Sequence, residues 1–290
     1  SSSMRVTSAC WIAMSRDRIE EATEQWEAAL AAFREAGDRW GISVTLGALG
    51  YVARLRGHYA QAIALINESL TLFRELGDRA GVSYSLIRLG NLAWRRGDYS
   101  EAMALIQESL TIQRDRNNQE GIIAALQIQA LITTAQGQFE QATALLRESA
   151  TLAEARALPG EIGDNLVFQA QVCYADNQLD KATALFDKSL AIFRTENETE
   201  GVAVNCYGLG LVALHQGNYQ SATLHLNESL RLWQLRGHKH HIATAHTALG
   251  QLALAQGEPR SAAIHFHAAL ALYQEMVDKR GAAAALESVS

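Results

Sequence analysis

A forty-residue repeat runs through this chain without a single insertion or deletion. The stretch 41–80 returns as 81–120, 121–160, 161–200, 201–240 and 241–280. Three columns of the repeat are nearly constant: glycine recurs at the Gly57 position, alanine at the Ala62 position and leucine at the Leu70 position. A fixed period of about 20–50 residues is the sequence signature of a solenoid, in which each unit packs on its neighbours. The sequence therefore predicts one elongated array.

Each unit contains two predicted helices. Apolar and small residues at three-and-four spacing place the first helix at 39–55 and the second at 59–76. Asp38 and Asp78 precede the first helices of successive units, where a carboxylate can accept hydrogen bonds from the free amides of a helix start. Gly57 suits the corner between the helices because glycine readily adopts the left-handed conformation. The predicted fold class is therefore all-α, an α-solenoid of helix-turn-helix units.

Two short motifs recur in all six full units. In the first of these they read Leu46-x2-Leu49-Gly50-x2-Ala53 and Gly57-x-Tyr59-x2-Ala62-x3-Ile66. This pattern resembles the tetratricopeptide repeat (TPR) family, whose signature is a Trp/Leu-x2-Leu-Gly-x2-Tyr helix followed by an Ala-x3-Phe helix. The resemblance covers essentially the whole chain and implies a right-handed superhelix. The small residues Gly50 and Ala62 are predicted to mark the point where the two helix backbones cross closely.

The chain departs from the family pattern in two ways. The proline that usually ends the second helix is absent, with Arg74 in its place. The period is also about six residues longer than the usual 34, which extends the helices of each unit by about 9 Å in total. Long-period repeats of this kind resemble the sensor arms of large bacterial signalling ATPases and transcription activators. They also resemble the peptide- and protein-binding arrays of eukaryotic adaptor proteins.

The predicted domain organisation follows the repeat. Residues 1–3, a run of serine, are interpreted as a cloning scar, and 4–290 as a single TPR solenoid domain of seven stacked units. The units are 4–40, 41–80, 81–120, 121–160, 161–200, 201–240 and 241–280, with a partial helix at 281–290. Neither end carries an evident polar capping helix, which isolated solenoids usually have. The simplest interpretation is a segment of a longer protein.

Composition argues against several function classes. A net charge of −6 argues against direct nucleic-acid binding. No long apolar run or secretory leader is present, so we expect a cytoplasmic chain that does not span a membrane. The cysteines match no zinc spacing, and the histidines, eight of nine at or after His215, include no His-Glu-x2-His motif. No nucleophile–base or acid–base pair emerges, so we expect no enzyme, no metal and no cofactor.

The TPR resemblance implies that the first helices line a concave groove. Helical spacing places one stripe of residues there, and its composition varies from unit to unit while the core columns do not. The candidate binding residues are Trp11, Tyr51, Arg54, Tyr84, Arg88, Asn91, Trp94, Arg95, Gln127, Gln171, Tyr174, Tyr207 and His215. Tyrosine, tryptophan and arginine are the residue types that most often anchor interfaces.

Arginines gather in the second and third repeats, 41–80 and 81–120, where Arg54, Arg88, Arg95 and Arg96 accompany Asn91 and Trp94. One hypothesis is that this patch holds an acidic or carboxylate-bearing part of a ligand through forked hydrogen bonds. The alternative is that the arginine stems pack on neighbouring helices while their heads stay in water. The lysines of the chaperone-binding carboxylate clamp have no counterpart in these helices, so binding of chaperone tails is not expected.

Two function classes stay open. The first is a non-catalytic interaction module that binds a protein or peptide segment in its groove, as part of a larger signalling or regulatory protein. The second is a small-molecule-sensing arm of a signalling ATPase or transcription activator. An apolar concavity with scattered polar groups suits either.

Overall fold

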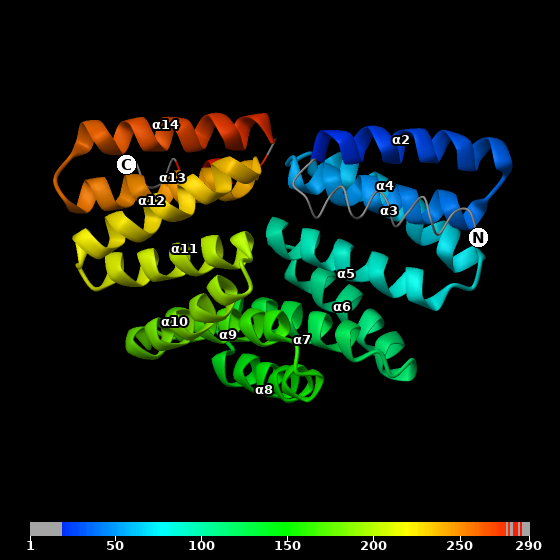
Figure 1. Ribbon diagram of the computed structural model, residues 1–290, viewed down its shortest axis with the longest axis horizontal. Coiled ribbons are helices and arrows are strands. Elements are labelled where there is room, and N and C mark those ends of the chain that lie inside the picture. Colours follow the sequence, from blue (N-terminus) through cyan, green and yellow to red (C-terminus); the bar gives the residue numbers. More distant parts are fainter. Residues whose placement is uncertain (1–18, 277, 279–280, 284, 286–290) are drawn as a thin grey trace. The chain divides into compact units, whose positions relative to one another are not determined.

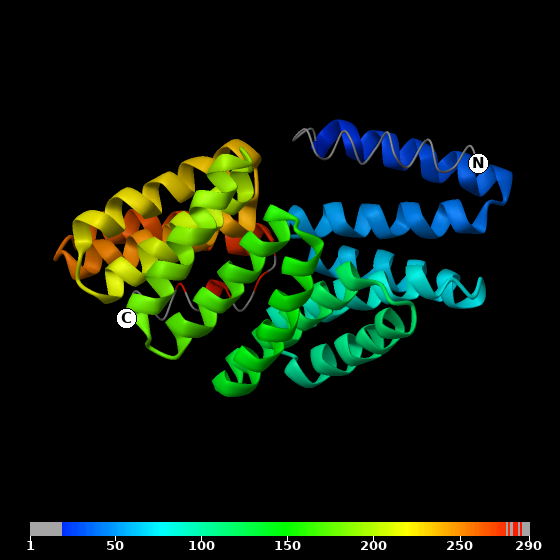
Figure 2. The same ribbon diagram turned by 60° about the horizontal axis from the view of Figure 1, so that its bottom comes forward.

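The fold is all-helical over the residues that the structure describes. The computed structural model describes residues 19–276, 278, 281–283 and 285, and the repeat unit proposed for 4–40 therefore lies partly outside them. Thirteen helices follow one another in this described part, which contains no strand. Successive helices run antiparallel and are joined by short turns, as both views show (Figures 1 and 2). The predicted all-α repeat array is confirmed.

The chain forms two compact units, residues 1–121 and 122–290. The first holds α2 (Ile19–Ala36), α3 (Arg39–Leu55), α4 (Tyr59–Glu75), α5 (Arg79–Arg96) and α6 (Tyr99–Asp115), and α7 (Gln119–Ala135) begins at its end. The second holds α8 (Phe139–Arg156), α9 (Pro159–Ala175), α10 (Leu179–Thr195), α11 (Thr199–His215), α12 (Tyr219–Arg236), α13 (Lys239–Ala255) and α14 (Pro259–Glu275). That 4–290 forms one domain stays a prediction.

The predicted helix boundaries agree with the observed ones because local signals set them. Helix α3 begins directly after Asp38, whose carboxylate accepts a hydrogen bond from the amide of Gly41 at 2.9 Å. Asp78 caps α5 in the same way, accepting from the amides of Ala80 and Gly81. The chain then turns at Gly57, which has a φ of +80°. Caps and a left-handed glycine thus fix where these helices start and stop.

Close approach of α3 and α4 depends on the absence of a side chain at Gly50. A Cβ atom there would lie 2.6 Å from Cγ1 of Ile66 and 3.3 Å from the carbonyl oxygen of Ala62. Ile66 and Ala62 are both fully buried. The predicted crossing point is therefore confirmed, and the glycine at position 50 is explained by packing between helices rather than by backbone conformation.

A column of buried serines joins the two helices of a repeat. Ser69 is fully buried, and its hydroxyl donates a hydrogen bond to the carbonyl oxygen of Ser43 on the preceding helix at 2.7 Å. The same column holds Ser109, Ser149, Ser189 and Ser229, all fully buried. In the second unit, the Asn205 amide donates to the Ser189 hydroxyl at 2.9 Å and so links neighbouring repeats. Buried hydrogen bonds of this kind fix the register between helices.

Candidate functional site

Two neighbouring helices of the first unit carry most of the predicted binding residues. Helices α3 and α5 are the first helices of consecutive repeats and contact each other. Their facing residues recur at three-and-four spacing, which keeps them on one side of each helix. We call this surface the arginine–tyrosine face, and it consists of Gly47, Tyr51 and Arg54 on α3 with Tyr84, Arg88, Asn91 and Arg95 on α5.

The ring of Tyr51 lies at the centre of the arginine–tyrosine face. The guanidinium carbon of Arg54 lies 4.7 Å from the ring centroid, and that of Arg88 lies 5.9 Å from it. These distances are within the range of cation–π attraction, which requires about 6 Å or less. Tyr51 therefore gathers two arginines from two different repeats.

A second group lies further along α5. The Nε of Arg95 donates a hydrogen bond to the side-chain oxygen of Asn91 at 3.1 Å, and the guanidinium carbon lies 5.7 Å from the centroid of the Trp94 ring. Tyr84, at the other end of the helix, is 40% exposed. The predicted residues of the first unit thus form two contact groups rather than isolated side chains.

Arg96 does not join its neighbours, which corrects the expected cluster of four arginines. Its guanidinium forms ion pairs of 2.9 Å with Asp98 and with Glu101. One residue along a helix turns the side chain by about 100°. Arg96 therefore leaves the face that Arg95 occupies and turns toward the start of α6.

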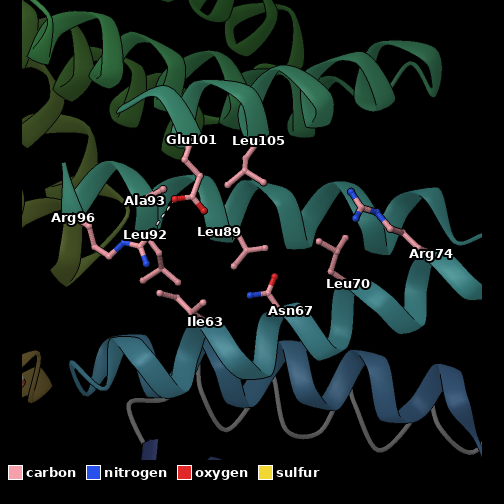
Figure 3. Close-up of a pocket in the computed structure, with 10 residues that line it drawn as sticks. All are labelled: Ile63, Asn67, Leu70, Arg74, Leu89, Leu92, Ala93, Arg96, Glu101 and Leu105. Carbon is pink, nitrogen blue, oxygen red and sulfur yellow. Dashed lines mark hydrogen bonds and ion pairs between the residues drawn. The ribbon is translucent and has the colours of Figure 1, made fainter. Parts of the chain in front are cut away.

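Arg96 instead lines a pocket between α4, α5 and α6 that the sequence analysis missed (Figure 3). Arg74 and Arg96 lie at its two ends, and Asn67 points between them. The remaining lining residues are Ile63, Leu70, Leu89, Leu92, Ala93, Glu101 and Leu105. An apolar floor with a charged rim is typical of a small-ligand pocket. No sequence signal marked it, since its residues come from three helices and combine buried apolar positions with exposed polar ones.

All charged side chains of α3 and α5 are positive. Their sequences contain six arginines and neither aspartate nor glutamate. Burial is the largest cause that lowers the pKa of the Arg88 guanidinium; the Tyr51 hydroxyl opposes this effect and the positive charge of Arg54 adds to it. The arginine–tyrosine face is therefore a positively charged surface on a chain whose net charge is −6.

The candidate residues of the second unit are dispersed. Tyr174 and His215 make an edge contact with ring centroids 5.9 Å apart. Burial raises the pKa of Tyr207 far above its ordinary value. Gln127 is buried, and its side-chain nitrogen has no hydrogen-bond partner among the described residues, whereas Gln171 is half-buried. Trp11, the remaining candidate, lies outside the described residues.

Acidic residues replace arginines on three first helices of the second unit. Asp164 on α9 lies at the position equivalent to Val44, and α7, α9 and α11 contain neither arginine nor lysine. Desolvation is the largest cause that raises the pKa of Asp164 to about 6, followed by the negative charges of Glu198, Glu161 and Glu200, although the residue is exposed. These three helices thus differ from α3 and α5 in the sign of their charge, whereas α13 carries Lys239 and no carboxylate.

Two histidines meet in the last repeat. The Nδ1 atoms of His246 and His265 lie 3.0 Å apart, and the ring centroids lie 5.3 Å apart. Because each ring atom lies about 1.2 Å from its centroid, the two nitrogens point directly at one another, as a hydrogen bond between neutral imidazoles requires. Across the described part of the chain, no three histidine, cysteine or acidic side chains converge as a metal site would need.

Comparison with known families identifies the repeat. The family model of the MalT-like TPR region matches residues 9–204, and a tetratricopeptide repeat model matches 202–275. The chain belongs to the tetratricopeptide repeat family, in its MalT-like form over most of its length. No curated protein matches the chain by sequence.

Solved structures show the same fold at low sequence identity. The apo form of RapI is 13% identical, with a TM-score of 0.69 over 96% of this chain and 99% of its own. The Rap conjugation regulator of plasmid pLS20, in complex with the Phr* peptide, is 13% identical with a TM-score of 0.75, over 93% of this chain and 73% of its own. A signal transduction ATPase with a TPR sensor from Pyrococcus horikoshii is 14% identical with a TM-score of 0.62, over 94% of this chain but 43% of its own.

None of the described helices is both long enough and apolar enough to cross a bilayer.

Proposed function

We propose that this chain is a non-catalytic TPR interaction module that binds a protein or peptide segment along the first helices of its repeats, within a larger cytoplasmic signalling or regulatory protein. The arginine–tyrosine face carries this proposal. It concentrates aromatic and guanidinium groups, the side chains that most often dominate binding energy at interfaces, on two adjacent helices. The solved complex of a Rap protein with a peptide, which shares the fold, supports a peptide as the type of partner.

The candidate residues divide into two sets under this proposal. Tyr51, Arg54, Tyr84, Arg88, Asn91, Trp94 and Arg95 are the contact residues of the first unit. Gln127, Gln171, Tyr174, Tyr207 and His215 are the candidate contact residues of the second unit, and Trp11 is the candidate outside the described residues. An extended segment that lies along several first helices would meet a different side chain at each repeat, which accounts for the variability of this stripe.

The experiment that tests this proposal places a photo-crosslinking amino acid at Tyr84. Leu76, which follows α4, is the matched control because both side chains are 40% exposed. The chain is irradiated in native lysate, and the crosslinked peptides are identified by mass spectrometry. We expect one protein segment to be captured from position 84, to be absent from position 76, and to be lost when Trp94→Ala is added. Equal capture from both positions would contradict the proposal.

The second candidate function is a small-molecule-sensing arm of a signalling ATPase or transcription activator. The pocket between α4, α5 and α6 favours it (Figure 3), as does the likeness to a signalling ATPase with a TPR sensor. Native mass spectrometry of the chain purified from its own lysate separates the two functions. A bound small mass that is lost in an Asn67→Leu variant, without any protein crosslinked at position 84, would favour the sensor.

A further inference from the structure

Arg88 occupies a place that the repeat otherwise reserves for small or apolar residues. The equivalent positions in the other full repeats are Ala48, Ile128, Phe168, Gly208 and Ala248. Its guanidinium reaches from α5 across α3, where Nη1 lies 2.9 Å from the point that a Cβ of Gly47 would occupy. The Ser69 hydroxyl of α4 lies 3.3 Å from the same point. The guanidinium is therefore inserted among three helices.

Gly47 and Arg88 form a matched pair. Gly47 is the only glycine in its column, whose other members are Ile87, Gln127, Val167, Tyr207 and Thr247. A side chain at position 47 would occupy the space that the guanidinium fills, so the unusual glycine and the unusual arginine depend on each other. The repeat that precedes the buried charge thus supplies the space for it.

Arg88 has no anionic partner in the described part of the chain. No carboxylate lies within ion-pair distance of it or of Arg54, and the charged group that acts on Arg88 is the like-charged Arg54. Other arginines of this chain do find carboxylates: Arg34, Arg39, Arg74, Arg79, Arg96, Arg156, Arg231 and Arg236. Arginine is rarely buried unless it is paired. Two unpaired guanidiniums around one ring therefore form a site that an anion would complete.

The site remains open to a ligand. Arg88 is mostly buried but keeps some exposed surface, and Arg54 is likewise only half-buried. Tyr84, which lies one turn before Arg88 on α5, is 40% exposed. An anion that reaches Arg54 from solvent would approach Arg88 past the Tyr51 ring, where lowered water content strengthens a charge-assisted hydrogen bond.

We propose that Arg54 and Arg88 hold a carboxylate carried by an acidic peptide segment. This inference rests on the proposed function and adds the chemistry of the partner. A peptide fits better than a nucleic acid, because nucleic-acid binding draws on contacts to many phosphates and this chain is acidic overall. The carboxylate belongs either to an aspartate or glutamate side chain or to the C-terminus of the segment, since both present the same two oxygens to a guanidinium.

The test is affinity selection by the full chain from a synthetic octapeptide library, read by mass spectrometry. The library is prepared with free carboxyl termini and with amidated termini, so that side-chain and terminal carboxylates are distinguished. The variants are Arg88→Met and Arg54→Met, each of which removes one guanidinium and keeps an apolar side chain. Arg34→Met is the control, because Arg34 is an exposed arginine on α2. Circular dichroism verifies that each variant is folded.

We expect the parent chain and Arg34→Met to enrich peptides with a carboxylate at a fixed position. Arg88→Met and Arg54→Met should each lose about tenfold or more of that enrichment. Enriched peptides without any preference for carboxylates would overturn the anion site and leave the proposed function intact. No enrichment of any peptide would count against both. A single-stranded DNA oligonucleotide that binds the parent but not Arg88→Met would overturn the peptide as the occupant.

Discussion

Two glycines on helix α3, three residues apart, should respond in opposite directions to the same substitution. At Gly47 the nearest atom to a new Cβ is Nη1 of Arg88, at 2.9 Å, the tip of a long side chain. At Gly50 it is Cγ1 of Ile66, at 2.6 Å, an atom near the backbone of a fully buried residue. The guanidinium can move by a few tenths of an ångström at small cost, whereas Ile66 has no free space to move into.

The magnitudes decide the sign in each case. Alanine is about 0.8–1 kcal/mol more favourable than glycine in a helix interior. Gly47→Ala should therefore raise the free energy of unfolding by about 0.5–1 kcal/mol, since displacement of the arginine offsets only part of this gain. Overpacking a core costs about 1–3 kcal/mol. Gly50→Ala should thus lower the free energy of unfolding by up to about 2 kcal/mol despite the better helix propensity.

The measurement is urea unfolding followed by circular dichroism, together with amide hydrogen exchange of α3. Hydrogen exchange is needed because repeat arrays can unfold in parts, so a global midpoint alone can miss a local change. Gly47→Ala carries a second expectation: it should weaken binding of the acidic peptides while it increases stability, because it displaces Arg88. Shifts of the same sign in both variants would refute the reasoning from the contacts of each glycine.

Three further predictions follow from the same contacts. Burial lowers the pKa of His246 and His265 below 6.5, and the charge of His265 lowers that of His246 further. The unfolded chain therefore binds more protons than the folded chain as the pH falls. The stability that these two histidines contribute should be fully present above about pH 6.5 and decrease below it. Hydrogen exchange of α13 and α14 between pH 7.5 and 5.5 measures this loss, which a His246→Leu/His265→Leu variant should not show. Asp78→Ala removes the cap of α5 and also the acceptor of the Trp40 Nε1 hydrogen bond from α3; it should cost about 1 kcal/mol or more, visible as faster exchange in the first turns of α5 and α3. Ala62→Phe, at a fully buried crossing point, should cost roughly 1–3 kcal/mol or more in urea unfolding, and an unchanged midpoint would contradict the assigned crossing.

The sequence predicts most of the residues of the candidate site, but it does not predict which of them contact one another. The stripe containing Tyr51, Arg54 and Trp94 follows from helical spacing and from the variability of these columns among constant ones, whereas Arg88 was included only because arginines gather in these two repeats. Some arginines meet a carboxylate of the next repeat, as with Arg74 and Glu108, which are separated by 34 residues. Others meet one just beyond the end of their own helix, as Arg96 does with Asp98 and Glu101 at the start of α6. Spacing within one helix describes neither contact, so the sequence alone grouped Arg96 with arginines that it does not join.

The buried polar contacts escaped the sequence analysis for a related reason. Ser69 recurs nearly as regularly as the apolar columns, but a search for apolar periodicity counts a serine as a surface residue. Its burial depends on a carbonyl oxygen of the neighbouring helix that lies within hydrogen-bond distance. His246 and His265 occupy two columns that hold leucine in the other full repeats except at Cys206 and His225, and only the packing of α13 on α14 brings their nitrogens together.

The sequence by itself determined the repeat, the helix boundaries, the caps and the crossing points, because each depends on residues within one turn or one hairpin of each other. The tertiary structure decided which charged side chains are paired and which are not. The repeat places Arg88 on α5, but the open space over Gly47 and the absence of a nearby carboxylate arise only when α3, α4 and α5 pack together. Charge pairing depends on distances through space, and a periodic sequence fixes those distances only after its units have stacked.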